Sequence, residues 1–167
     1  PLEKQGVDFW WLDWQAWLAN RRFKNMGNTW WLNYVFFTDM ERQGRSRPLL
    51  FHRWGGRGNH RYQIGFSGDA ISVWESLAFQ PYFTATAANV GFGYWSHDIG
   101  GFELTASSDV YKRWCAFGLL SSHSRLHGNA SYRVPWAYND PEAVDVLRYF
   151  TKLKCRLMPY LFDAAVE

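Results

Sequence analysis

Apolar runs alternate with stretches of helical period along most of this chain, and this alternation constrains the fold more than any other feature. The first run, Val7 to Leu12, is continuously apolar apart from Asp8, as is typical of a strand buried on both faces. Segments with helical periodicity follow such runs, which predicts parallel strands joined by helices. The predicted fold class is therefore α/β.

Five such units are expected. The expected strands are residues 7–12, 47–52, 62–66, 90–95 and 132–134, and the expected helices are residues 29–43, 72–80, 108–120 and 140–158. The second expected helix ends before Pro81, because proline disfavours a helix interior. The last helix carries start signals, with Asp140 as N-cap and Pro141 at the first helical position.

Each expected strand ends in a polar, glycine-rich loop, and chemistry at the carboxyl ends of parallel strands is the rule in α/β barrels. A complete TIM (β/α)8 barrel has eight units and about 250 residues. We therefore expect residues 1–167 to form the later portion of such a barrel, about strands 4 to 8, as one partial catalytic domain. Earlier strands and accessory β domains would lie outside this sequence. The rest of the same polypeptide would be needed to complete the barrel, so the segment alone should be unstable and show little activity.

Composition excludes several classes of function. The formal net charge is +3, but the basic residues are scattered, so nucleic-acid binding is not expected. There is no apolar run long enough to predict a membrane span, and no ligand-like spacing predicts a metal site. No cofactor is implied. Localisation and oligomeric state are left open, since a signal peptide would not be visible in a chain that begins in mid-domain.

Two aspartates, Asp13 and Asp69, stand among aromatic residues and glycines at the ends of separate expected strands. Glycoside hydrolysis requires such a pair: one carboxylate attacks the anomeric carbon and the other transfers a proton. Retaining enzymes hold the two carboxyl groups about 5–5.5 Å apart, whereas inverting enzymes hold them roughly 6.5–9.5 Å apart. The alternative for either residue is a turn or helix N-cap, and Asp69 precedes an expected helix closely enough to fit that role.

The segment around Asp13, Gly-Val-Asp-Phe-Trp-Trp-Leu-Asp-Trp-Gln at 6–15, resembles the nucleophile motif of glycoside hydrolase family 31, the retaining α-glucosidases and α-xylosidases. The resemblance implies that Asp13 is the nucleophile and that Trp11 forms a wall of the sugar pocket. Phe9 replaces a glycine of the family motif, and Trp14-Gln15 replaces the Met-Asn usual in α-glucosidases. The α-xylosidase branch has a lysine at the position of Trp11, so this half resembles the glucosidase pattern more.

The segment Phe-Ser-Gly-Asp at 66–69, followed by Trp-Glu at 74–75, resembles the family's acid/base motif, with Phe66 in place of a tryptophan. It implies that Asp69 is the acid/base residue and that Phe66 is its apolar neighbour in the pocket. Arg53, sixteen positions upstream, matches the family's substrate-binding arginine and would also support the charge of Asp13. The alternative for Arg53 is a surface arginine, but its spacing from the other motifs favours a sugar contact.

Downstream, Asp-Ile-Gly-Gly-Phe at 98–102 and Arg-Leu-His at 125–127 resemble two further family motifs. They imply that Asp98 and His127 bind sugar hydroxyls and that Phe102 lines the same pocket, although a turn aspartate before two glycines is the alternative for Asp98. From about Trp95 to Tyr160 the resemblance favours the α-xylosidase branch. The two halves of the chain therefore point to different sugars.

The resemblance implies retaining hydrolysis of terminal α-glycosidic bonds, in α-glucosides or α-xylosides, through a covalent glycosyl–Asp13 intermediate. The expected partner is an oligosaccharide or α-glycoside substrate. Two alternatives remain at this point: a transglycosylase with the same residues, and a non-catalytic carbohydrate-binding barrel. Neither the sugar nor the acceptor follows from the residues themselves.

Overall fold

The computed structural model of the chain describes residues 2–13, 19–45, 47–53 and 56–166. These residues form two compact units. The first unit runs up to Gly65 and includes Val90–Phe92, and the second consists of Phe66–Asn89 and the residues from Gly93 onward. No described helix is both long and apolar enough to cross a membrane.

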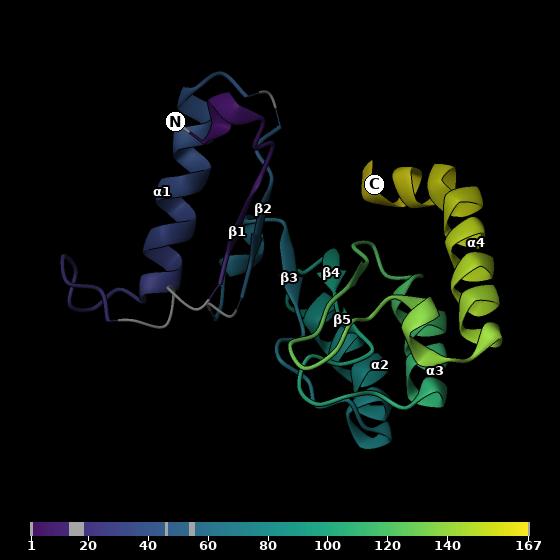
Figure 1. Cartoon of the computed structure of the whole chain (residues 1–167). Helices are drawn as coiled ribbons and strands as arrows, with labels where there is room; N and C mark the ends of the chain where they lie inside the picture. Colours follow the sequence, from purple (N-terminus) through teal and green to yellow (C-terminus); the bar gives the residue numbers. More distant parts are fainter. Residues whose placement is uncertain (1, 14–18, 46, 54–55, 167) are drawn as a thin grey trace. The chain divides into compact units, whose positions relative to one another are not determined.

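The first unit is a strand–helix–strand arrangement. Strand β1 (Trp10–Leu12) pairs in parallel with β2 (Leu50–His52), and helix α1 (Asn28–Arg42) connects them and packs against both (Figure 1). Strand β3 (Ile64–Phe66) extends the parallel pairing through Phe51 and Ile64. Short 3-10 turns, η1 (Glu3–Gln5) and η3 (Asn59–Arg61), lie before β1 and before β3.

The side chains of β1 and β2 alternate between two faces of this unit. Trp10, Leu12 and Leu50 pack with Met40 of α1 in the apolar core. Since successive strand residues point to opposite faces, Trp11, Phe51 and the residues one step beyond the strand ends belong to the other face. The face away from α1 is therefore where β1 and β2 can present polar groups.

The second unit contains the remaining elements. They are α2 (Trp74–Asn89), β4 (Tyr94–Ser96), β5 (Asp98–Ile99), α3 (Ser108–Gly118), β6 (Arg125–Leu126), the 3-10 turn η4 (Pro135–Tyr138) and α4 (Pro141–Val166). Strands β5 and β6 are parallel, with Asp98 opposite Arg125 and Ile99 opposite Leu126. Helices α3 and α4 pack together over a core that includes Ile99, Tyr111 and Trp114.

Most expected elements are confirmed, with two kinds of correction. Helix α2 continues past Pro81 to Asn89, and α4 continues past Pro159 to Val166. Burial of Leu77 and Ala87 on either side of Pro81 outweighs the loss of one backbone hydrogen bond in α2. The N-cap prediction at Asp140 is confirmed, because its Oδ1 accepts from the Glu142 amide at 3.0 Å.

The expected strand at residues 132–134 is wrong. This segment forms no strand, and the last strand is β6, at Arg125–Leu126. The carbonyl of Arg133 accepts a hydrogen bond from the hydroxyl of Tyr111 at 2.8 Å instead of joining a strand ladder. A side chain from α3 thus takes the backbone partner that a strand would have needed.

Candidate active site

Asp13 and Arg53 meet at the carboxyl ends of β1 and β2. The register places Leu12 opposite His52, so the next residue of each strand, Asp13 and Arg53, also lies side by side. Arg53 Nε donates to Asp13 Oδ1 in an ion pair. The arginine side chain is 5% exposed and the aspartate 26%, so a buried cation holds a carboxylate that still faces solvent.

An aromatic pair lies two positions before this ion pair on the same two strands. Trp11 and Phe51 are opposite each other in the register and stack with ring centroids 5.3 Å apart. On the other face of β2, buried His52 places Nδ1 2.7 Å from the Arg53 carbonyl oxygen and 3.0 Å from Asn59 Nδ2, and Asn59 Oδ1 accepts from Asn33 Nδ2 of α1 at 3.0 Å. Burial lowers the pKa of His52, which keeps this network neutral beneath the ion pair.

Asp69 lies in the loop that follows β3. Gly68 has φ of +81°, and the Ala70 amide donates to the Gly68 carbonyl at 2.9 Å, which forms a tight turn around Asp69. The first backbone bond of α2 runs from the Leu77 amide to the Val73 carbonyl, four positions after Asp69. Asp69 is half-buried and is not the N-cap of α2, so the capping alternative for this residue is ruled out.

A second aspartate–arginine pair is built by β5 and β6. Asp98 and Arg125 are opposite each other in the register, and Arg125 Nη2 donates to Asp98 Oδ1 at 2.5 Å. Asp98 is fully buried, and the Arg125 side chain is 16% exposed. The Arg125 guanidinium lies 4.9 Å from the ring centre of Phe66, which ends β3. Phe66 and Arg125 both belong to the second unit.

Phe102 and His127 extend this group of residues. Phe102 follows β5, His127 follows β6, and their rings stack with centroids 5.2 Å apart and planes 19° from parallel. Both side chains are half-buried, so each keeps part of its surface accessible. Stacked rings beside a charged pair form a surface that suits the apolar face and the hydroxyl edge of a sugar.

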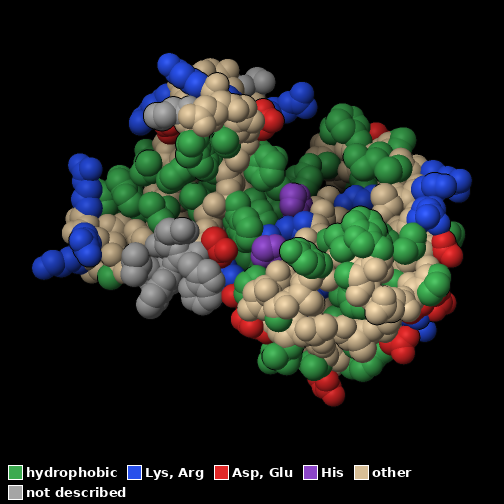
Figure 2. Space-filling view, in the orientation of Figure 1, with side chains coloured by type: hydrophobic (Ala, Val, Ile, Leu, Met, Phe, Trp, Pro, Cys, Tyr) green, Lys and Arg blue, Asp and Glu red, His purple; other side chains and the backbone are tan. Residues whose placement is uncertain are grey.

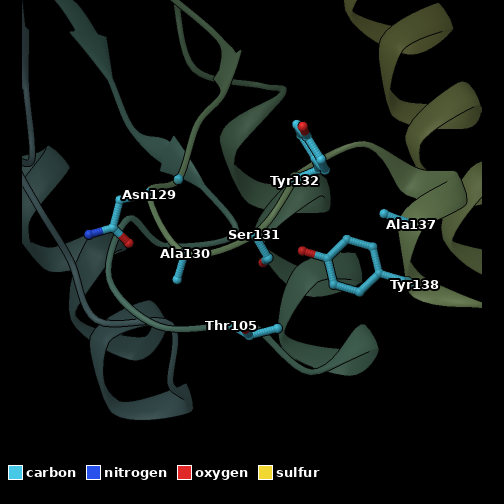
Figure 3. A pocket seen from close by; sticks show the side chains of 8 residues that line it. Thr105, Asn129, Ala130, Ser131, Tyr132, Ala137 and Tyr138 are labelled. Carbon is cyan, nitrogen blue, oxygen red and sulfur yellow. The ribbon is translucent and has the colours of Figure 1, made fainter.

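A hollow of about 640 Å³ opens beside the loop that follows His127. In Figure 3 the hydroxyl of Tyr138 points toward Ser131 across this hollow. The residues around it are Thr105, Gly128, Asn129, Ala130, Ser131, Tyr132, Ala137 and Tyr138. The loop after His127 is therefore open on this side.

The comparisons with known proteins agree with this geometry. The family model described as Glycosyl hydrolases family 31 TIM-barrel domain matches residues 2–164. The chain belongs to glycosyl hydrolase family 31. Among curated relatives, an α-xylosidase from Emericella nidulans is 43% identical over 133 residues, covering 80% of this chain and 17% of that protein. α-Xylosidase XylQ from Lactiplantibacillus pentosus is 55% identical over 80 residues, covering 46% of this chain and 10% of that protein.

Solved structures of family 31 enzymes have the same fold. A cycloalternan-degrading enzyme from Trueperella pyogenes superposes with a TM-score of 0.73 at 25% identity, covering 84% of this chain and 21% of that chain. The α/β fold with parallel strands and alternating helices is thus a partial barrel of this family. The chain spans less than a quarter of the length of these relatives.

The structure brings the predicted site residues together in two groups. Trp11, Asp13 and Arg53 lie in the first unit, and Phe66, Asp69, Asp98, Phe102 and His127 lie in the second. The expected proximity of Arg53 to Asp13 is confirmed. The separation of Asp13 and Asp69 stays a prediction, because the two residues belong to different units. Trp14 and Gln15, which depart from the family motif, lie outside the described residues.

Sequence reasoning placed Arg125 in a family motif without giving it a role. The spacing between Arg125 and His127 was a usable signal for such a role. Residues two positions apart along a strand project to the same face, and His127 directly follows β6. By contrast His97, next to Asp98, faces the other way. It is buried, with Nδ1 3.0 Å from Gln80 Oε1 of α2 and its ring 4.7 Å from that of Phe117. Among the described residues no cluster of three or more His, Cys, Asp or Glu side chains could hold a metal ion.

Proposed function

We propose that this chain carries both catalytic carboxylates of a retaining α-glycosidase that acts on α-xylosides. The observation that carries the proposal is the pairing of Asp13 with buried Arg53 at the carboxyl ends of adjacent parallel strands. Active sites of α/β barrels lie at this end of the strands. The ion pair places a cation beside the carboxylate that would attack the sugar.

In the first step, Asp13 attacks the anomeric carbon. Arg53 binds Oδ1, which leaves Oδ2 to form the bond to the sugar. Asp69 protonates the oxygen of the leaving group as the glycosidic bond breaks. The products of this step are the free aglycone and a glycosyl ester on Asp13.

In the second step, Asp69 acts as a base. It removes a proton from water, and the water oxygen attacks the anomeric carbon from the side that the aglycone has left. The ester bond to Asp13 breaks and the carboxylate returns to its pair with Arg53. The sugar leaves with the anomeric configuration of the substrate.

The remaining residues are assigned to sugar binding. Phe102 and His127 provide a stacked wall, Arg125 is held by Asp98 over Phe66, and Trp11 stacks on Phe51. The choice of xylose is supported by the names of the relatives that share 43% and 55% identity with this chain, both α-xylosidases. Trp11 stands where the resemblance to the α-xylosidase branch calls for lysine, so the pocket differs from that pattern at one wall.

The test uses the complete barrel that contains these residues, because the site of a barrel is built from several strands. Asp13→Ala should lower turnover of 4-nitrophenyl α-xyloside by about 10⁴-fold or more while substrate binding is retained. Asp69→Ala should still react slowly with this activated substrate, and azide should restore its rate. A 5-fluoro-xylosyl fluoride should label Asp13, as peptide mass analysis would show. Normal turnover by Asp13→Ala would overturn the nucleophile assignment, and a panel of 4-nitrophenyl α-glycosides would show whether glucose is preferred.

Transglycosylation is the second candidate. An isomaltosyltransferase from Sporosarcina globispora is 29% identical over 143 residues, covering 77% of this chain and 13% of that protein. The same covalent intermediate serves both reactions, and only the acceptor differs. Product analysis at high sugar concentration decides between them: hydrolysis gives free xylose, and transfer gives longer saccharides.

A further inference from the structure

Arg133 is a buried cation in the second unit that no catalytic step uses. It is 4% exposed and makes five hydrogen bonds. Nε donates to the Gly101 carbonyl at 2.9 Å, and Nη2 donates to the Leu104 carbonyl at 2.7 Å and to Ser72 Oγ at 3.1 Å. Nη1 donates to both the carbonyl and the hydroxyl of Ser131.

These bonds join three loops, and each loop carries a residue of the proposed site. Ser72 follows Asp69 by three positions, Gly101 precedes Phe102, and Ser131 follows His127 by four positions. Ser72 Oγ extends this hydrogen-bond network, since it donates to the Glu103 carbonyl at 2.6 Å. One guanidinium therefore ties the acid/base loop to both loops of the sugar-binding wall.

Glycines leave the space that the guanidinium occupies. A Cβ at Gly100 would lie 2.7 Å from Arg133 Cδ, and one at Gly128 would lie 2.7 Å from Arg133 Cζ. At Gly101, where φ is +82°, a Cβ would lie 2.5 Å from Ser72 Oγ. The backbones of the loops after β5 and β6 thus approach the arginine and its serine partner more closely than a residue with a side chain would allow.

The charge of Arg133 is not stabilised by an ion pair with any described residue. All five acceptors of Arg133 are neutral oxygens, so the charge is compensated by dipoles rather than by a carboxylate. Burial of a cation costs free energy unless its hydrogen-bond donors are satisfied. Here the planar guanidinium group of Arg133 donates to acceptors on three segments at once. Lysine has a compact ammonium group instead of a planar guanidinium group and could not make all of these contacts together.

We propose that Arg133 is a positioning residue that fixes the loop of Asp69 relative to the loops of Phe102 and His127. This inference rests on the proposed function. Proton delivery to the leaving oxygen depends on the position of Asp69, and sub-ångström errors in such a position are costly. Loss of Arg133 should therefore act mainly on the step that needs the acid.

The experiment compares two substrates in the complete barrel. Arg133→Lys should lower kcat/KM for a xylosyl disaccharide by about 100-fold, the cost of roughly 1 Å of misplacement. For 4-nitrophenyl α-xyloside, whose leaving group needs little protonation, the loss should stay below about tenfold. Arg148→Lys is the matched control: Arg148 is an exposed arginine of α4 paired with Asp145, and its variant should behave as wild type with both substrates.

Two further measurements keep the proposal testable if Arg133→Lys does not fold. Ser72→Ala removes one link only, and it should lower the disaccharide rate more than the nitrophenyl rate. Addition of guanidinium to Arg133→Ala should restore part of the disaccharide rate. Equal losses with both substrates would overturn the proposal, because a purely structural role reduces all turnover by the same factor. An inactive wild type would instead count against the proposed function itself.

Discussion

At the residue scale, two aspartate–arginine pairs are held in different environments. Asp13 keeps 26% of its side chain exposed beside Arg53, whereas Asp98 is completely buried beside Arg125. An exposed carboxylate can meet a substrate, and a buried one can orient its partner. The proposed division of roles, with Asp13 as nucleophile and Asp98 holding Arg125 at the sugar pocket, follows from this difference.

Removal of Arg125 should destabilise the protein strongly, because the Asp98 carboxylate would be left buried without its cation. Arg125→Met should lower the free energy of unfolding by about 3–5 kcal/mol, measured by urea titration of the complete barrel. Arg148→Met breaks the exposed pair with Asp145 and should cost less than about 1 kcal/mol. The double variant Arg125→Met with Asp98→Asn should recover part of the loss. Equal costs for the two arginines would show that the Asp98 pair does not stabilise the fold.

At the element scale, the parallel pairing of strands determines which of the proposed site residues lie next to each other. Asp13 and Arg53 are adjacent because β1 and β2 pair in register, and Asp98 faces Arg125 because β5 and β6 do. Sequence motifs identified Asp13, Arg53 and Asp98, but the partner of Asp98 could not be predicted, since it depends on the register between strands 27 positions apart. The same limit explains the wrong strand at 132–134, where a contact from Tyr111 decides the backbone.

Local signals predicted helix starts better than helix ends. Asp140 caps α4, as the sequence predicted, and the structure shows that Ser107 caps α3 by accepting from the Val110 amide at 3.3 Å. Pro81 gave a misleading stop signal, and α4 also continues past Pro159 to Val166. Whether a helix continues past proline depends on what its neighbouring turns bury, which a single sequence does not show.

His97 lies between β4 and β5 and packs against α2 and α3, and it should make the fold sensitive to acid. Burial lowers the pKa of His97 to about 4. Between pH 6.5 and pH 4 the unfolded chain therefore binds a proton that the folded chain does not, and stability falls as pH is lowered through this window. From pH 7 to pH 5 the contribution of His97 to the free energy of unfolding should fall by about 2 kcal/mol.

Urea titrations of the complete barrel at these two pH values check this prediction. His97→Gln should show a smaller loss of stability between pH 7 and pH 5 than the wild type. His60→Gln, which changes an exposed histidine, should keep the wild-type loss. The assignment to His97 fails if both variants show the same pH dependence.

At the scale of the whole molecule, both units carry exposed large hydrophobic side chains. Figure 2 shows hydrophobic side chains over much of the visible surface of both units. On α4 the exposed apolar side chains include Tyr149, Tyr160 and Phe162, each more than 60% exposed, and Trp136 of η4 is 73% exposed. Large exposed patches of this kind mark surfaces that contact other protein parts or cause aggregation.

Expressed alone, the 167-residue chain should therefore aggregate and show no measurable turnover of 4-nitrophenyl α-xyloside. The open edges of its parallel sheet and the apolar face of α4 would pair with other copies, because no further barrel strands cover them. Size-exclusion chromatography with light scattering, together with binding of an apolar dye, measures this directly. The complete barrel is the control and should elute as a defined species with activity. A monodisperse 167-residue chain that unfolds cooperatively and hydrolyses the substrate would show that these units form the site without additional strands.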